Sequence, residues 1–129
     1  MIERKGTKEM RSIEVLVLGG GASGMMAAIM AAREHAHVMI LEKKNRLGKK
    51  LLATGNGRCN FTNLHMNENC YYGNSEFISH LLTEVPAKCV IAEFEKYGIL
   101  HREKDGYVYP HTNQAATVVN GLYHACTQF

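Results

Sequence analysis

The sequence shows no long apolar run and no CxxC pair, and no secretory leader is visible in it; each of these points argues against a class of protein. No stretch of about 18 residues is free of both charge and glycine, so we expect no membrane span. The first twelve residues, MIERKGTKEMRS, are polar, unlike the apolar centre of a secretory leader. The four cysteines (Cys59, Cys70, Cys89 and Cys126) show no zinc-binding spacing. We therefore expect a cytoplasmic protein with reduced thiols rather than a disulfide or metal scaffold.

Acidic residues are also missing from one short segment. The 129 residues carry a net charge of +3, and the chain is 46% hydrophobic and 21% charged, which is typical of about one folded domain. Between residues 43 and 58 there is no acid, but there are six bases: Lys43, Lys44, Arg46, Lys49, Lys50 and Arg58. An anionic ligand should bind there. The alternative is a solvated basic loop.

The pattern near the start predicts a parallel βαβ unit. Residues 13–18, IEVLVL, form a short apolar run that is typical of a strand buried on both faces. Glycines follow, and then a helix is expected over residues 22–34, because alanine and methionine favour helices. A second apolar run covers residues 37–41. Strand, glycine turn, helix and strand together indicate an α/β, Rossmann-like fold.

The remaining chain alternates between irregular and regular patterns. Residues 43–74 show no periodicity, and a stretch of that length is commonly functional. Helices are predicted over residues 76–83 and 87–97, followed by a hairpin that pairs residues 99–103 with residues 107–109. A last helix, capped by Thr112 or Asn113, should end near Tyr123. Two parallel strands are too few for a doubly wound domain, so we expect a truncated piece of a longer protein.

The glycine turn carries the fingerprint of a dinucleotide site. In Gly19-x-Gly21-x-x-Gly24, the first glycine permits the tight turn, the second lets a pyrophosphate approach the backbone, and the third lets the helix pack closely. The amino end of the helix attracts phosphate. Glu42 ends the second strand, where an acid accepts hydrogen bonds from a ribose diol and disfavours the 2′-phosphate of NADP.

A second loop, GKKLLATGNGRCNFTN over residues 48–63, favours anion binding, with a plain surface loop as the alternative. Gly55 and Gly57 would let the backbone turn tightly against a ligand. The side chains that could bind ribityl or phosphate oxygens, or neutralise them, are Thr54, Asn56, Asn60, Lys50 and Arg58.

These motifs together resemble one flavoprotein family. GGGASGMMAA, LEK, GKKLLATGNGRCNFTN and the later GYVYPHTNQAATVVNGL are similar to FAD-dependent oxidoreductases that include 3-dehydro-bile-acid reductases and proteins labelled as aminoacetone oxidases. The resemblance implies a Rossmann-like FAD-binding domain. Residues 1–12 would be a polar tail, and residues 13–129 would be the N-terminal part of that domain, truncated before the substrate domain.

The resemblance also implies which residues contact the cofactor. The FAD pyrophosphate would lie on Gly19, Gly21, Ala22, Ser23 and Gly24, and the adenosine ribose on Glu42. The rest of FAD would be lined by Lys43, Lys50, Gly55, Asn56, Gly57, Arg58, Cys59 and Asn60. NAD(P)H is a candidate electron donor and the substrate is a small molecule. No catalytic residue, nucleic acid, membrane or protein partner is predicted, and the isolated chain should be inactive.

Two other functions share some of these features. An NAD-dependent dehydrogenase fragment has the same fingerprint and acid, but the long basic loop argues against it. A non-catalytic nucleotide-binding remnant is the other alternative. We interpret Cys59 as a packing residue. His35 and His37 are two residues apart across a predicted helix–strand junction, so they do not share one helix face that could bind a metal.

Overall fold

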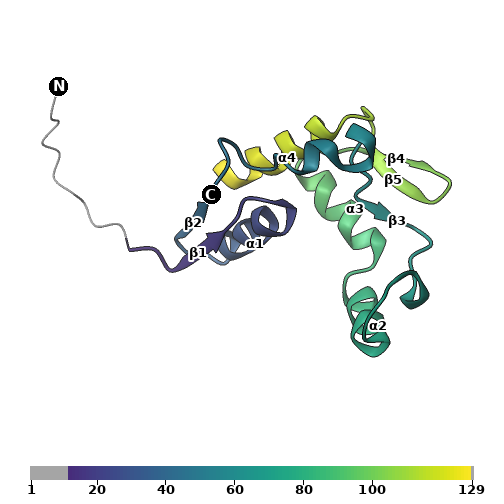
Figure 1. Ribbon diagram of the computed structural model, residues 1–129. Helices are drawn as coiled ribbons and strands as arrows, with labels where there is room; N and C mark the ends of the chain where they lie inside the picture. Colours follow the sequence, from purple (N-terminus) through teal and green to yellow (C-terminus); the bar gives the residue numbers. More distant parts are fainter. Residues whose placement is uncertain (1–11, 129) are drawn as a thin grey trace, which may run out of the picture.

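The computed structural model describes residues 12–128 and shows two regions joined by one core (Figure 1). The polar tail predicted for residues 1–12 lies outside the described residues, except for Ser12. The elements in chain order are β1 (Val15–Leu18), α1 (Ala22–Arg33), β2 (Val38–Leu41), η1 (Leu51–Gly57), β3 (Thr62–Asn63), η2 (Glu68–Cys70), α2 (Ser75–Glu84), α3 (Ala87–Lys96), β4 (His101–Lys104), β5 (Tyr107–Pro110) and α4 (Ala115–Gln128).

The first region is the predicted parallel βαβ unit. β1 pairs with β2 in register from Val15 opposite Val38 to Leu18 opposite Leu41. The alternation of side chains along a strand places Val15 and Val17 in half-buried positions, while Leu16 and Leu18 stay exposed. α1 contacts both strands, as Figure 1 shows. The predicted α/β, Rossmann-like class is therefore confirmed in this region.

A left-handed residue ends α1 and turns the chain toward β2. His35 has φ of +64°, and the Ala36 N–H donates to the Ala31 carbonyl at 3.2 Å while the His35 N–H donates to the Ala32 carbonyl at 2.9 Å. This is the Schellman arrangement that closes many helices. The helix ends one residue before the predicted boundary at Glu34.

The second region is a small antiparallel sheet with two helices. Its strand order is β3-β5-β4, and β4 and β5 form the predicted hairpin. α2 and α3 match the two predicted helices within one residue at each end. The prediction that residues 43–74 are wholly irregular was wrong, because η1, β3 and η2 lie within them. β3 is held by pairing with β5, a partner that is distant in sequence.

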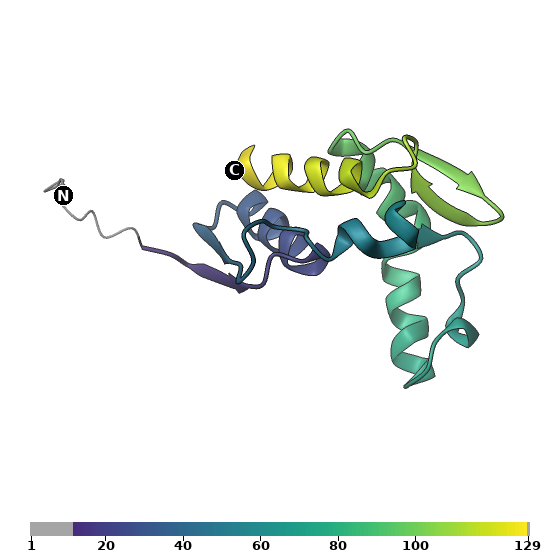
Figure 2. The same cartoon turned by 45° about the horizontal axis from the view of Figure 1, so that its top comes forward.

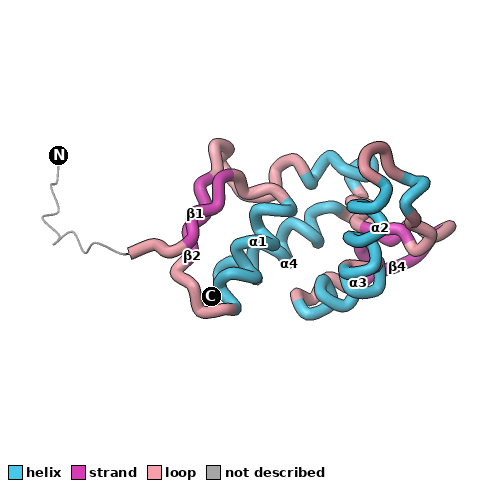
Figure 3. The backbone as a smooth tube through the Cα atoms, turned by 90° about the horizontal axis from the view of Figure 1, so that it is seen from below, coloured by secondary structure: helices cyan, strands magenta, loops and turns pink. Residues whose placement is uncertain are grey.

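α4 connects the two regions. It packs against α1 and η1 and runs to Gln128, five residues past the predicted end at Tyr123. Figures 2 and 3 show α4 beside α1 in both views. The buried cluster draws residues from α1, the loop after η1, α3, the loop between α3 and β4, and α4: Met25, Ile29, Cys59, Phe94, Ile99, Ala115, Val118, Leu122 and Ala125. This single core fixes the position of the glycine turn relative to the basic loop.

No helix within residues 12–128 combines the length and the apolar character that crossing a bilayer requires.

Candidate dinucleotide-binding site

In the glycine turn after β1, Gly19 and Gly24 have the backbone geometry that the fingerprint predicts for a tight turn and for close helix packing. Gly19 has φ of +98°, a conformation that side chains disfavour, and its N–H donates to the Leu41 carbonyl at 2.7 Å. A Cβ atom at Gly24 would collide with the Gly19 carbonyl oxygen. Gly19 therefore makes the turn, and Gly24 brings α1 against it.

The third glycine, Gly21, borders open space at the amino end of α1. Its φ of −76° suits any residue, and a Cβ atom there would have no neighbour within 4 Å. Gly21 is the N-cap and provides no side-chain hydrogen bond, so Ala22 and Ser23 begin the helix with outward N–H groups. The space beside Gly21 is thus bordered by backbone donors and by the positive end of the helix dipole.

Glu42 reaches across from the end of β2 to this turn. One carboxylate oxygen accepts a hydrogen bond from the Gly20 N–H at 2.7 Å, and the other accepts from the Lys44 N–H at 2.7 Å. These backbone donors, Lys44 first and then Gly20, hold the pKa of Glu42 below its ordinary value. The carboxylate is therefore ionised and fixed in orientation, and each oxygen keeps a lone pair for a further donor.

Residues that the sequence analysis missed fasten the basic loop onto the glycine turn. The Gly48 N–H donates to the Gly20 carbonyl at 2.7 Å, and the side chain of Leu47 fills the space where Gly20 would carry a Cβ atom. Gly48 itself, with φ of +68°, lies against Val119 of α4. Leu47 and Gly48 stand out in the sequence as an apolar residue and a glycine within a run of bases. The sequence does not indicate that their partner is Gly20.

The loop predicted to bind the rest of the cofactor is tightly folded on itself. η1 is kinked at Thr54, Gly55 and Asn56, where the dihedral angles leave the helical region. A Cβ atom at Gly55 would lie 2.6 Å from the backbone nitrogen of Asn60. The glycine at this position therefore lets the two ends of the loop approach each other closely. Gly57, with φ of +79°, is exposed, and a Cβ atom there would make only an ordinary contact with the Leu52 carbonyl oxygen at 3.9 Å.

Three predicted site residues in this loop make internal contacts. Asn60 donates through its side-chain amide to the carbonyls of Thr62 and Val108, both at 3.0 Å. Arg58 lies over the ring of Tyr109, with 5.1 Å from its guanidinium carbon to the ring centroid. Cys59 is buried in the core, as its interpretation as packing requires. Burial raises the pKa of the Cys59 thiol, and a hydrogen bond with Thr54 opposes that effect.

The basic side chains of residues 43–58 are available for an anion. Within the described part of the chain, the ion pairs are Arg33–Glu93, Lys96–Glu93 and His101–Glu95, and none uses a base of this segment. Lys43 and Lys50 are exposed. Lys43 follows Glu42 directly, and Lys50 stands immediately before η1.

Residues 12–128 contain no cluster of three or more metal-ligating side chains. Cys126, near the end of α4, is half-buried, and burial raises its pKa. Cys70 and Cys89 are exposed and lie on η2 and α3.

Comparison with protein families gives one match over nearly the whole chain. Residues 13–129 match the HI0933-like protein Rossmann domain. A 3-dehydro-bile acid delta(4,6)-reductase of Clostridium scindens is 46% identical over 109 residues, which are 82% of this chain and 27% of that protein. A ribosomal RNA dihydrouridine synthase of Escherichia coli is 31% identical over 96 residues, 74% of this chain and 24% of that protein. The chain thus spans about a quarter of the length of these curated relatives.

Among solved structures, the crystal structure of Thermovibrio ammonificans THI4 shares the fold. The TM-score is 0.55 at 19% sequence identity, and the match covers 90% of this chain and 35% of that one. An identity this low supports the Rossmann-like fold alone.

Proposed function

The chain belongs to the HI0933-like Rossmann-domain family, and from that premise we propose that it is the N-terminal, FAD-binding segment of a flavin-dependent oxidoreductase. One observation carries the proposal. The open space beside Gly21 is bordered by the amino end of α1 and lies on the same turn that fixes the Glu42 carboxylate. A nucleoside diphosphate needs these two features side by side.

We assign a part of the ADP moiety to each feature. The pyrophosphate would lie against Gly19 and Gly21 and accept hydrogen bonds from the N–H groups of Ala22, Ser23 and Gly24. The adenosine ribose would donate its hydroxyls to Glu42, whose carboxylate is already oriented by the Gly20 and Lys44 N–H groups. Because the carboxylate is ionised, a 2′-phosphate at this position would be repelled, which disfavours NADP.

The second loop would contact the cofactor through fewer side chains than the sequence suggests. Asn60 and Cys59 are used within the fold, so their contribution would come from the backbone. Lys43, Lys50 and Arg58 would supply positive charge, and Asn56 and Gly57 lie exposed at the tip of η1.

The bound flavin would supply hydride transfer, while the chain orients it and sets the local charge. The two relatives are named a 3-dehydro-bile acid delta(4,6)-reductase and a ribosomal RNA dihydrouridine synthase. One name is that of a reductase and the other that of an enzyme that makes a dihydro product, so we propose that the whole protein reduces its substrate, with NAD(P)H as electron donor. The catalytic residues would lie outside this segment.

A hybrid protein tests the cofactor. The matched 109-residue segment of the Clostridium scindens reductase is replaced by the corresponding residues of this chain, and the unaltered reductase is the control. The cofactor is released from the folded hybrid by heat and identified by chromatography. Recovery of FAD is expected. Recovery of NAD or FMN alone from a hybrid with the circular dichroism of the control would contradict the proposal, with NAD favouring the dehydrogenase alternative.

A further inference from the structure

Gly20 is a glycine that the dinucleotide fingerprint does not require. The fingerprint uses Gly19, Gly21 and Gly24, and any residue is allowed between the first two. The φ of Gly20 is not positive, so its backbone conformation does not select glycine either. The reason for a glycine at this position therefore lies in the residues that surround it.

Both backbone groups of Gly20 are bonded to one short segment, residues 42–48. The Gly20 N–H donates to a carboxylate oxygen of Glu42 at 2.7 Å, and the Gly20 carbonyl accepts from the Gly48 N–H at 2.7 Å. Leu47 occupies the place of a side chain, because a Cβ atom on Gly20 would overlap the Leu47 Cδ2 atom and lie 3.2 Å from its Cγ atom. We call this arrangement of Glu42, Leu47 and Gly48 around Gly20 the Gly20 clamp.

The Gly20 clamp has little room to give way, because it is packed against the core. Leu47 is half-buried and packs against the buried cluster. Gly48 is buried, and a Cβ atom there would lie 2.9 Å from Val119 of α4 and 3.3 Å from Met25 of α1. A larger residue in place of Gly20 would therefore displace the segment that begins with Glu42.

The position of this segment matters for the proposed cofactor site. It carries Glu42, to which we assigned the ribose, and the exposed bases of residues 43–46. Leu47 leaves the place of the pyrophosphate free, since a Cβ atom on Gly21 would have no neighbour within 4 Å. An effect of Leu47 on the cofactor would therefore pass through the Gly20 clamp rather than through direct contact with the pyrophosphate.

We propose that Leu47 is a positioning residue of the cofactor site, which fills the Cβ place of Gly20 and thereby holds Glu42 and the basic segment on the glycine turn. A site held in its binding arrangement before the ligand arrives binds more tightly. The effect on FAD rests on the proposed function, whereas the Gly20 clamp can be tested without a cofactor.

The contacts also predict a relation between the sizes of two side chains. With Leu47 in place, only glycine fits between Gly19 and Gly21. Once Leu47→Ala removes the colliding atoms, the nearest remaining neighbour of an added Cβ atom on Gly20 is the Glu42 carboxylate at 3.4 Å, an ordinary contact. Leu47→Ala should therefore make Gly20→Ala tolerable.

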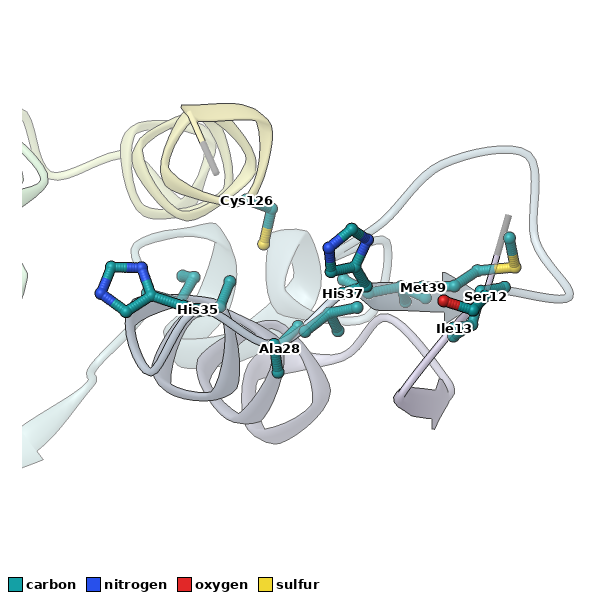
Figure 4. Close-up of a pocket in the computed structure, with 12 residues that line it drawn as sticks. Ser12, Ile13, Ala28, His35, His37, Met39 and Cys126 are labelled. Carbon is teal, nitrogen blue, oxygen red and sulfur yellow. The ribbon is translucent and has the colours of Figure 1, made fainter. Parts of the chain in front are cut away.

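A control variant is available at the other end of α1. A groove of about 570 Å³ is lined there by Ala28 and Ile29 of α1 and by Cys126 of α4, and Figure 4 shows the sulfur of Cys126 directed from α4 toward α1. The groove is lined by no residue of the Gly20 clamp. Ile29 is 1% exposed, so Ile29→Val loosens the same core without touching the Gly20 clamp.

Amide hydrogen exchange in the 129-residue chain tests the Gly20 clamp. The exchange rates of the Gly20 and Gly48 N–H groups are measured relative to that of Leu122, which lies in the core part of α4. Leu47→Ala should raise these relative rates at least about tenfold, because both N–H groups are bonded within the Gly20 clamp. Ile29→Val should leave them unchanged. Equal changes in the two variants would show that Leu47 only stabilises the fold and would overturn the proposal.

FAD binding by the hybrid reductase tests the effect on the cofactor. Leu47→Ala should weaken FAD binding about threefold, and Gly20→Ala should weaken it at least about tenfold. The double variant should bind FAD as tightly as Leu47→Ala alone, a rescue that independent losses of stability would not give. Ile29→Val should bind FAD as the unaltered hybrid does. If Gly20→Ala does not fold, folding of the double variant is the same rescue.

The outcomes separate this proposal from the proposed function. Equal FAD affinity of Gly20→Ala and the double variant would overturn the positioning role of Leu47, and so would unaltered FAD affinity of Leu47→Ala. If the unaltered hybrid releases no FAD, the proposed function fails. The exchange rates of the Gly20 and Gly48 N–H groups then still decide whether Leu47 holds the glycine turn.

Discussion

The strands of the two regions bury their apolar residues to different extents. In the parallel βαβ unit neither strand has a fully buried residue, and Leu18 is 77% exposed. In the antiparallel region, Val108 of β5 and Ile99 just before β4 are 0% exposed. Both regions use short strands of four residues at most, so strand length does not explain the difference.

The difference follows from the two kinds of sheet. A parallel sheet is normally covered on both faces, and here α1 covers one face of β1 and β2 while Leu16, Leu18, Met39 and Leu41 stay exposed on the other. The antiparallel sheet packs against α3 and α4, which bury Val108 of its central strand β5. The strands that carry the dinucleotide fingerprint thus contribute no fully buried residue, and their region reaches the core through Met25, Ala28 and Ile29 of α1. Most of the other core residues lie on α4, the helix that connects the two regions.

The largest expected effect is a difference in stability between the regions. Ile99→Ala removes a side chain from the middle of the core and should lower the free energy of unfolding by about 2–5 kcal/mol. Leu18→Ala, a comparable truncation on the exposed strand face, should change it by less than about 0.5 kcal/mol. Urea unfolding of both variants, followed by circular dichroism, measures the two values. Equal losses would show that the strand face is covered in solution.

A second prediction separates two glycines of the same turn. Gly21→Val fits the backbone, since Gly21 has φ of −76° and open space around it, but the valine would fill the place of the pyrophosphate. In the hybrid reductase it should weaken FAD binding at least about a hundredfold, about 3 kcal/mol, without changing the circular dichroism.

Gly24→Val is the matched control, because its Cβ atom would collide with the Gly19 carbonyl. It should lose both FAD and native structure. A yellow Gly21→Val hybrid with normal flavin content would show that the cofactor does not lie against this turn.

The elements that depend on local pattern were predictable from sequence, and those that depend on distant partners were not. β1, α1 and β2 follow from hydrophobic runs and glycines, and the α2 and α3 boundaries follow from periodicity. β3, in contrast, is a two-residue strand that exists only because it pairs with β5. Nothing in the residues around Thr62 indicates that partner.

The same distinction applies to the candidate site. The roles of Gly19 and Gly24 in shaping the turn agree with the geometry, because the fingerprint describes local backbone needs. The polar residues of the second loop were harder to interpret. Asn60 looked like a ligand-binding side chain, but its amide joins the loop to β5, and the ring under Arg58 comes from Tyr109. The binding roles of all these residues stay predictions.

A third prediction concerns the ion cluster that joins α1 to α3. Glu93 pairs with Arg33 at 2.5 Å and with Lys96 at 2.8 Å, and it accepts a hydrogen bond from the Tyr97 hydroxyl. Partial burial would raise the pKa of Glu93, but the hydrogen bonds from Lys96, Tyr97 and Arg33 together lower it to about 2. The pKa is lower in the folded state, so this contribution is complete above the ordinary pKa of 4.5 and is lost as the pH falls toward 2.

Glu93→Gln should therefore lower the free energy of unfolding by about 1–2 kcal/mol at pH 7, and by progressively less below pH 4.5. Urea unfolding at several pH values gives the two curves. Glu95→Gln on the same helix is the control, since Glu95 is exposed and pairs only with His101 among the described residues. A difference between wild type and Glu93→Gln that stays constant down to pH 3 would contradict the assignment to the Glu93 carboxylate.

The smallest expected effect is electrostatic and again contrasts the two regions. The 129-residue chain alone should bind ADP with a dissociation constant of roughly millimolar to high micromolar, on the order of 4–6 kcal/mol, because only the pyrophosphate and ribose contacts are present. Exposed charges are screened beyond about 10 Å at 0.1 M salt and beyond about 3 Å at 1 M. Since Lys43 and Lys50 are exposed, high salt should weaken ADP binding about threefold to tenfold.

Removing both lysines by Lys43→Ala and Lys50→Ala should weaken ADP binding at low salt and reduce its dependence on salt. Removing Lys88 and Lys104, two exposed lysines of the other region, should change neither quantity. Isothermal titration at low and high salt measures both. If the two double variants behave alike, the attraction belongs to the net charge of the chain rather than to the basic loop beside the glycine turn.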